Sequence, residues 1–244
     1  MEVDFDKAGD LFDGGRLALI RRMFSRAELS PEKRAISAIA CLQAIGDSKN
    51  LVSILKLIVT GRSELRMVYE ALLQGYLFCG YPRAIESFFC LGEATSSRED
   101  LDPGLFPARH FGKSDDLSER GMETHKAVHG KNSARMRNKI SALCPDLAYL
   151  MITEGYGHVL SRPYLDMKTR ELAIVSSISA IGSNRQLNSH IRGCRNVGCK
   201  DVEIYESIFT GLLWLPAGRV EESIGIWSDI TGHTVSEAIT DFIE

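Results

Sequence analysis

The sequence predicts an all-α fold with no significant sheet, organised as two tandem helical repeats that pack together. Apolar residues recur at the i, i+3, i+4 and i+7 spacing of an amphipathic helix, and the alternation typical of a half-buried strand is not evident. Residues 136 positions apart also match without gaps, as in Ala44-Ile45-Gly46 and Ala180-Ile181-Gly182. A constant spacing of this kind indicates one structural unit present twice.

Each unit opens with a predicted helical hairpin. Ser30-Pro31 supplies an N-cap followed by proline at the first helical position, and the apolar run behind it stops at Gly46. In the second unit Asp166 can cap a run that stops at Gly182. A second helix with one apolar stripe follows each glycine, so we expect the first two helices of each unit to be antiparallel neighbours.

Two further helices are expected in each unit. The third covers residues 64–78 in the first unit and 201–214 in the second. The fourth begins after a turn, at residues 80–82 in the first unit and 216–218 in the second, where glycine and proline interrupt the helical pattern.

The boundaries of the units follow from composition. Residues 96–117 contain Pro103-Gly104 and several charges, which is typical of a linker. We therefore expect an N-terminal repeat over residues 1–95 and a C-terminal repeat over residues 118–244. Helical patterns resume after the linker around residues 117–129 and 145–159.

Charge and composition exclude several classes of partner. The 244 residues carry a formal net charge of −3, and the basic residues are scattered, so nucleic acid is not expected. No apolar run approaches the roughly 18 residues of a membrane span, so a membrane is not expected either. The acidic start Met1-Glu2-Val3-Asp4 lacks the features of a signal peptide, and the six cysteines form no C-x-x-C motif. We expect a cytoplasmic protein.

Comparing the two repeats identifies a polar pair on a predicted core face. Where the first repeat has Ala35 and Ile54, the second has Glu171 and His190. A buried carboxylate or imidazole is costly unless it is paired, and the simplest remedy is for the two to bind each other. Because the first repeat lacks both groups, the fold does not need them.

The hairpin geometry makes contact between these two side chains feasible. Glu171 lies eleven residues before Gly182 and His190 eight after it, which differs from a symmetric placement by about one helical turn. A carboxylate that holds an imidazole fixes its tautomer and yields a group able to exchange a proton near neutral pH. Acid–base catalysis is one interpretation, and a buried pair that merely orients two helices is the other.

At these residues the sequence resembles the carboxymuconolactone decarboxylase and alkylhydroperoxidase-like family. The resemblance covers roughly residues 118–230 and is carried by Gly155-Tyr156-Gly157-His158, Ser161-Arg162-Pro163, Lys168-Thr169-Arg170-Glu171 and His190-Ile191-Arg192-Gly193. In the first repeat, Gly80-Tyr81-Pro82 is similar to the family's Y-x-G-x-P turn. The resemblance implies an all-helical fold that forms homo-oligomers, such as dimers, trimers or hexamers.

The decarboxylase branch implies chemistry on a small carboxylated lactone, an anionic organic molecule, without metal or cofactor. His190 would then donate or shuttle a proton and Glu171 would orient it. The second repeat departs from the family at the Y-x-G-x-P turn, where it has Leu213-Trp214-Leu215-Pro216. We therefore expect the wall of the pocket to differ from that of the family. The residues expected to contact the substrate are Arg162, Arg170, Tyr156 and Trp214.

Two alternatives stay open. The hydroperoxidase branch uses a redox cysteine pair between its Glu and His, but those positions are Ser183 and Gln186 here, which fit a helix capping box instead. Antioxidant activity of that type is therefore disfavoured. The other alternative is a non-catalytic oligomeric binding or assembly protein.

His125 and His129 are four residues apart on one predicted helix face, as in some metal sites. No third ligand is evident, and a catalytic zinc site needs one. We therefore expect a core or surface role for both and no metal.

Overall fold

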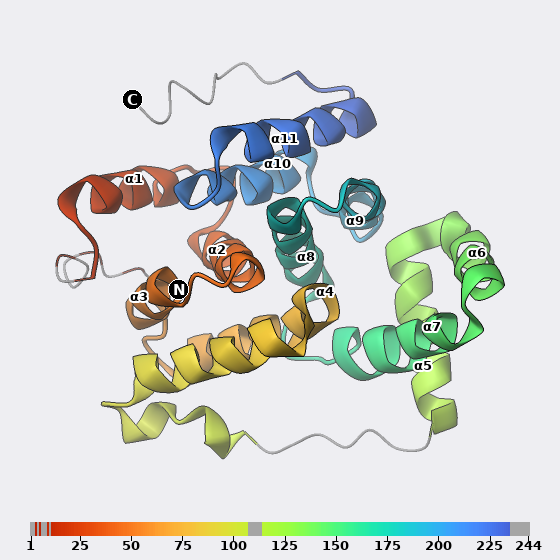
Figure 1. Cartoon of the computed structure of the whole chain (residues 1–244), viewed down its shortest axis with the longest axis horizontal. Coiled ribbons are helices and arrows are strands. Elements are labelled where there is room, and N and C mark those ends of the chain that lie inside the picture. The colour runs from red at the N-terminus through yellow and green to blue at the C-terminus, as the bar shows by residue number, and fades with distance from the viewer. Residues whose placement is uncertain (1–2, 4, 6–8, 10, 107–113, 235–244) are drawn as a thin grey trace.

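A computed structural model describes residues 3, 5, 9, 11–106 and 114–234 of the chain. This part is helical and contains no strand, which confirms the all-α prediction (Figure 1). The α-helices are α1 (Gly14–Phe24), α2 (Pro31–Ile45), α3 (Ser48–Ile58), α4 (Arg62–Thr95), α5 (Ser114–His129), α6 (Ser133–Leu143), α7 (Pro145–Leu150), α8 (Met167–Ile181), α9 (Asn184–Asn196), α10 (Asp201–Phe209) and α11 (Ala217–Thr231). A π-helix spans Met151–Leu160, and short 3₁₀ turns lie at Glu99–Leu101, Pro103–Leu105, Gly130–Asn132 and Thr210–Leu213.

The two predicted hairpins, α2–α3 and α8–α9, form as expected. The side chains of Ser30 and Asp166 accept hydrogen bonds from backbone N–H groups in the first turns of α2 and α8. Gly46 and Gly182 end these helices with φ values of +72° and +73°. This left-handed conformation carries little strain for glycine alone, which explains why both apolar runs stop there.

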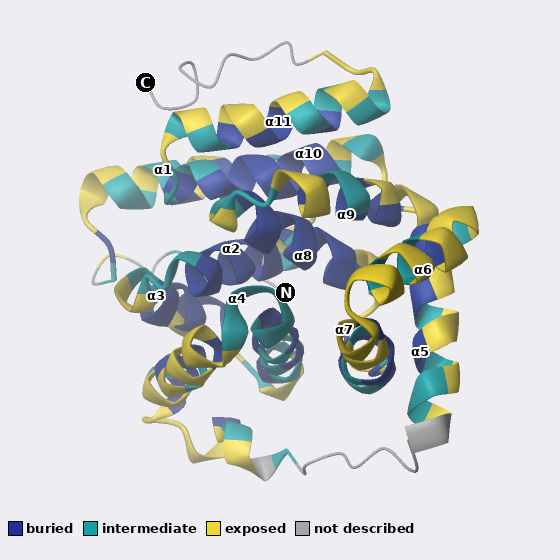
Figure 2. Cartoon of the chain, turned by 45° about the vertical axis from the view of Figure 1, so that its right-hand side comes forward, coloured by how far each residue is buried: buried dark blue, intermediate teal, exposed yellow. Residues whose placement is uncertain are grey.

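Helices α2 and α8 pack against each other at the centre of the molecule and are buried along most of their length (Figure 2). Small side chains allow a close approach. Ser176 and Ser177 of α8 donate hydrogen bonds to the backbone carbonyls of Ser37 and Ala40 of α2, at 2.8 and 3.1 Å. The interface between the halves of the chain is therefore its core.

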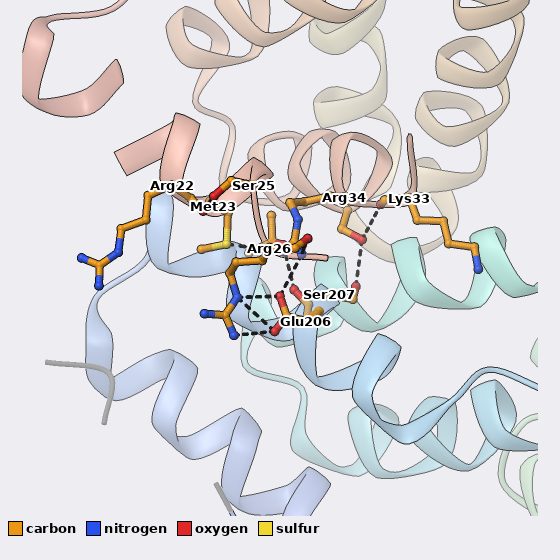
Figure 3. A network of polar contacts seen from close by, with 10 residues as sticks. Arg22, Met23, Ser25, Arg26, Lys33, Arg34, Glu206 and Ser207 are labelled. Carbon is orange, nitrogen blue, oxygen red and sulfur yellow. Dashed lines mark hydrogen bonds and ion pairs between the residues drawn. The ribbon is translucent and has the colours of Figure 1, made fainter. Parts of the chain in front are cut away.

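A buried ion triad joins the first half of the chain to α10. Glu206, 1% exposed, accepts a hydrogen bond from Arg26 at 2.6 Å and forms an ion pair with Arg34 at 2.9 Å (Figure 3). Arg34 also donates to the hydroxyl of Thr210 at 3.2 Å. One carboxylate thus neutralises two arginines from the other half of the chain.

A second triad joins the second half of the chain to α4. Glu70, fully buried, accepts hydrogen bonds from Arg162 at 2.7 Å and Arg170 at 3.2 Å. Arg170 also donates to the side-chain oxygen of Gln74 at 3.0 Å. Each member of this triad lies 136 positions from its counterpart in the first triad, and so does Gln74 from Thr210. Each triad takes its carboxylate from one half of the chain and its arginines from the other.

Helix α4 bends at the predicted turn. Gly80 has non-helical dihedral angles, φ 81° and ψ 167°, and Pro82 follows it. The expected third and fourth helices of the first unit are therefore two arms of one interrupted helix. This bend brings residues just before it close to α9.

Helix α5 and the π-helix approach each other through two glycines. A Cβ atom on Gly121 would lie 2.0 Å from the carbonyl oxygen of Ile152, and one on Gly157 would lie 2.2 Å from that of Leu117. Neither backbone atom could yield without moving its helix, so only glycine allows this contact. As a result, histidines of α5 lie beside Tyr156 of the π-helix.

Several expectations about individual elements need correction. Helices α1 and α6 were not predicted, and α5 begins at Ser114, inside the expected linker, whose residues 107–113 lie outside the described part. Ser183 is the N-cap of α9, but its side chain makes no capping hydrogen bond, so the predicted capping box is wrong. Among the described helices, none combines the length and apolar character that crossing a bilayer requires.

Candidate active site

Glu171 and His190 meet across the α8–α9 hairpin. Oε2 of Glu171 lies 3.0 Å from Nδ1 of His190, and the two residues are 0% and 5% exposed. The contact predicted from the hairpin is confirmed. Because a carboxylate only accepts hydrogen bonds, Nδ1 carries the proton and Nε2 is left for other partners. No hydrogen bond to Nε2 occurs among the described residues.

The backbone of α9 packs directly on this pair. A Cβ atom on Gly193 would lie 2.7 Å from Oε2 of Glu171 and 2.9 Å from Cγ1 of Val128. Glycine at this position therefore leaves room for the carboxylate between α8, α9 and α5. Gly193 belongs to the stretch that carried the family resemblance.

Three further buried side chains lie beside this pair, with His129 next to His190. We call the five residues Glu171, His190, His125, His129 and Tyr156 the histidine cluster. Nε2 of His129 and the hydroxyl of Tyr156 are 2.7 Å apart. The ring of His129 lies 4.4 Å from that of His125 and 6.0 Å from that of His190, between centroids. Sequence reasoning assigned His125 and His129 no part in the site, although their shared helix face was a signal.

Burial keeps the two histidines of α5 neutral. Desolvation, followed by the positive charges of Arg137 and His190, lowers the pKa of His125 to about 4. Desolvation, followed by the charges of His125 and His190, lowers the pKa of His129 to about 3. Burial and the charge of Glu171 raise the pKa of Tyr156 well above its usual value. All three side chains are uncharged near neutral pH.

Two buried polar atoms of the cluster have no hydrogen-bond partner. They are Oε1 of Glu171 and Nε2 of His125. An unsatisfied buried polar atom costs about 1–3 kcal/mol, so such atoms are rare in folded proteins unless a ligand or water completes them. Each of these two atoms can therefore make one further hydrogen bond.

The first half of the chain also contributes to this site. Phe78 of α4 contacts His190 edge-on, with ring centroids 5.7 Å apart and planes at 88°. Phe78 lies just before the bend at Gly80 and is half-buried. Its role could not be read from the sequence, because it depends on how α4 packs against α9.

Comparison with known proteins agrees with this geometry. The model of the carboxymuconolactone decarboxylase family matches residues 145–217, which include Tyr156, Glu171 and His190. The 4-carboxymuconolactone decarboxylase of Acinetobacter baylyi is 30% identical over 103 residues, which cover 41% of this chain and 77% of that protein. The chain belongs to the carboxymuconolactone decarboxylase family.

Two yeast proteins are also similar to this family member. Peroxisomal protein 2 of Saccharomyces cerevisiae is 28% identical over 163 residues, 57% of this chain and 56% of that protein. Peroxisomal protein 2 of Schizosaccharomyces pombe is 28% identical over 136 residues, 55% of this chain and 62% of that protein. The matches thus span less than two thirds of either yeast protein.

The two arginines expected to hold a substrate carboxylate are engaged elsewhere in this family member. Both bind Glu70, and Arg170 additionally donates to the backbone carbonyls of Leu165 and Arg162, at 3.1 and 3.0 Å. Arg170 is fully buried and its donors face these partners. The structure therefore joins Arg162 and Arg170 through Glu70, and Arg162 also lines a hollow of about 600 Å³.

The other two expected substrate contacts differ in their placement. Tyr156 lies in the cluster, as described. Trp214 instead lines a separate hollow of about 570 Å³ together with Ala180, Pro216 and Arg219. The sequence departure around Trp214 thus lies at a different part of the surface.

The described residues contain neither a set of metal ligands nor an activated thiol at the histidine cluster. No group of three or more His, Cys, Asp or Glu side chains there could hold a metal ion. Cys194 is fully buried, and desolvation raises its pKa well above the usual value. A thiol in this state is a poor nucleophile, which weighs against the antioxidant alternative.

Proposed function

We propose that this chain catalyses cofactor-free acid–base chemistry on a small carboxylated lactone, with His190 as the proton donor and Glu171 as its positioning residue. The observation that carries this proposal is the buried Glu171–His190 pair, whose imidazole Nε2 has no partner among the described residues. Membership of the carboxymuconolactone decarboxylase family supports decarboxylation as the reaction.

The proposed reaction proceeds in two steps. The bond between the ring and its carboxylate breaks, CO₂ leaves, and the electron pair delocalises towards the lactone carbonyl as an enolate. His190, protonated on both nitrogens, then transfers the Nε2 proton to a ring carbon and regains it from water. Glu171 stabilises the imidazolium and holds the Nδ1 proton, so that the proton transferred comes from Nε2.

Neutral surroundings favour this proton transfer. His125, His129 and Tyr156 carry no charge near neutral pH, so they do not repel the imidazolium or compete for its proton. The low exposure of His190 limits water, which strengthens its interaction with Glu171.

Turnover of 4-carboxymuconolactone by purified His190 variants tests this function. We expect His190→Ala to lose a factor of about 10²–10⁴ in kcat, the usual contribution of a general acid, without loss of helicity. His233→Ala is the matched control, because His233 is 60% exposed and pairs with Asp201 beyond the cluster. Unchanged turnover in His190→Ala, or no turnover in the unaltered chain, would contradict the proposal and favour a binding or assembly role.

We also propose that the chain consists of two copies of one unit, residues 1–95 and 118–244. The two ion triads support this, since Glu70 and Glu206 occupy equivalent positions and bind arginines of the opposite half. In the first unit Ala35 and Ile54, both fully buried, replace the catalytic pair. The first unit would then serve as scaffold and supply Phe78 to the site.

Assembly and location follow as further proposals. Family membership favours a homo-oligomer, which size-exclusion chromatography with light scattering would test. We expected the cytoplasm, whereas the name of the yeast relatives favours the peroxisome as a second candidate. Imaging a fluorescent fusion beside a peroxisomal marker distinguishes the two.

A further inference from the structure

Helix α6 and the turn before it carry positive charge without a compensating carboxylate. Residues 130–143 contain four cations, Lys131, Arg135, Arg137 and Lys139, and no Asp or Glu. Lys131, Arg135 and Lys139 are exposed, and within the described part of the chain their side chains form no ion pair or hydrogen bond. Since the whole chain has a net charge of −3, this segment departs locally from the overall charge balance.

Large apolar side chains are exposed directly after these cations. Leu143, the last residue of α6, is 78% exposed, and α7 exposes Leu147, Tyr149 and Leu150. Four of the eleven large hydrophobic residues that are exposed in the described part thus lie within eight positions. Ala148 is the buried residue of α7, so the outward side of this helix is mainly apolar. Exposed apolar patches rimmed by polar residues typically mark interaction sites.

The cations and the apolar residues form one surface, which we call the α6–α7 corner: Lys131, Arg135, Lys139, Leu143, Leu147, Tyr149 and Leu150. Arg135, Lys139 and Leu143 follow one another at intervals of four residues along α6 and therefore share one face of the helix. The backbone of Cys144 is extended, with φ −155° and ψ 96°, so the chain turns there and α7 starts at the next residue. Figure 2 shows both helices mostly exposed. Asp146 is the one carboxylate of residues 130–150, so the corner has a net positive charge.

The composition of the α6–α7 corner suits the surface of an anionic lipid bilayer. Segments that bind at this surface combine Lys and Arg, which attract anionic headgroups, with Leu side chains that enter the acyl boundary. Tyrosine, present here as the exposed Tyr149, is enriched at the same depth. Nucleic acid would use the cations but would leave the four apolar side chains in water.

A protein partner that docks through an acidic helix would need a groove. The hollow beside Tyr149 measures about 280 Å³, less than the pockets that hold small ligands, and is too small for a helix. A bilayer needs no groove, because apolar side chains insert among its headgroups. A membrane was not expected from the sequence because no apolar run could span one, whereas attachment to its surface requires no spanning helix.

We propose that the α6–α7 corner attaches this chain to membranes that contain anionic phospholipids. Lys131, Arg135 and Lys139 contact the headgroups, and Leu143 and Leu147 insert between them. Attachment of this kind is peripheral and reversible, and it depends on both the charges and the apolar side chains. It is independent of the proposed reaction, because it involves no residue of the histidine cluster.

Co-flotation of the purified chain with lipid vesicles tests the attachment. Vesicles of phosphatidylcholine and phosphatidylserine in equal parts provide the anionic surface, and vesicles of phosphatidylcholine alone are the neutral control. We expect binding to the anionic vesicles only. Binding should weaken when the salt concentration rises from about 0.1 M to about 1 M, because the Debye length then falls from about 10 Å to about 3 Å.

Single substitutions separate the contribution of charge from that of the apolar side chains. Lys139→Gln should weaken binding about fivefold, the usual effect of removing one cation near an anionic surface. Lys49→Gln on α3, at a lysine that is also exposed, should leave binding unchanged. Leu143→Ser should weaken binding about tenfold by removing an inserted side chain. Phe89→Ser on α4 is its matched control, because Phe89 is 69% exposed and lies outside the corner.

Cys144 provides a position for a reporter inside the corner. It is the exposed one of the six cysteines, all of which lie in the described part of the chain. An environment-sensitive dye attached there should shift its emission to shorter wavelength on anionic vesicles. The same dye on Lys49→Cys in a Cys144→Ser background should show no shift.

Several outcomes would overturn the attachment. Failure to float with anionic vesicles does so, as do equal losses of binding in Lys139→Gln and Lys49→Gln. Binding without a shift of the dye at Cys144 also overturns it, because the contact then lies elsewhere on the chain. Binding of soluble polyglutamate without binding to vesicles assigns the corner to an acidic protein segment instead. None of these outcomes depends on turnover of 4-carboxymuconolactone, so the proposed function is tested separately.

Discussion

Replacing Gly193 by alanine tests how closely the backbone of α9 packs on the Glu171 carboxylate. The added Cβ would lie 2.7 Å from Oε2 of Glu171 and 2.9 Å from Cγ1 of Val128. Val128 is β-branched and buried, so it yields little. The oxygen that would meet the Cβ also makes the 3.0 Å contact with His190, so a shift of the carboxylate alters that contact.

The magnitude follows from two opposing effects. Alanine in a helix interior is favoured over glycine by about 1 kcal/mol. Overpacking a full core costs about 1–3 kcal/mol. Gly225 of α11 isolates the first effect, because it is exposed and its Cβ would meet no atom within 4 Å. Gly193→Ala should therefore be about 1–3 kcal/mol less stable than Gly225→Ala.

Thermal unfolding of both variants measures this difference, together with turnover of 4-carboxymuconolactone. For a chain of this size the difference corresponds to roughly 2–12 °C in Tm. If Glu171 and His190 act as proposed, Gly193→Ala should also lose activity, since it forces the two side chains apart. Equal Tm values and full activity in both variants would refute the close packing of α9 on Glu171.

Three further predictions concern the ion triads, the buried histidines and the first unit. Glu70→Gln removes the carboxylate that two buried arginines share and should cost about 3–5 kcal/mol in urea unfolding. Glu222→Gln, at an exposed ion pair, should cost less than about 1 kcal/mol. The pKa of His129 is about 3 in the folded chain and 6.5 ordinarily, so as the pH falls the unfolded chain binds this proton first. The free energy of unfolding should therefore fall as the pH decreases from about 6.5, by up to about 1.4 kcal/mol per pH unit. The urea midpoint of His129→Gln should decline less over this range, and an identical decline would exclude His129 as the cause. Phe78→Ala should reduce kcat/KM several-fold, although Phe78 lies in the first unit, because its ring contacts His190. Phe89→Ala, at a residue that is 69% exposed, should leave kcat/KM unchanged. Equal effects of the two substitutions would show that Phe78 has no part in the site.

Local signals in the sequence predicted much of the fold. The helix ends at Gly46 and Gly182 and the N-caps at Ser30 and Asp166 all form as expected, because capping depends on a few neighbouring residues. Helix α6 was missed, since its sequence is polar and most of its surface faces solvent. A helix that buries few residues has few apolar positions, so its sequence shows little helical periodicity.

The candidate site was predicted where it depends on one hairpin. Glu171 and His190 are neighbours because α8 and α9 are joined by a tight turn, so their contact follows from counting residues. Arg162 and Arg170 were plausible carboxylate holders by proximity along the chain. Their actual partner, Glu70, comes from a helix about 100 residues away, which counting could not identify.

Apolar periodicity was enough to predict an all-helical chain, and comparison of its two halves was enough to single out His190 and Glu171 against apolar counterparts. The groups near this pair could be identified only in the folded chain. Glycine contacts between α5 and the π-helix bring His125 and His129 there, and the bend in α4 brings Phe78. The two kinds of interaction differ in how far they reach along the chain. Caps and turns act over one helical turn, whereas the surroundings of a buried imidazole depend on close packing between helices that are distant in the chain.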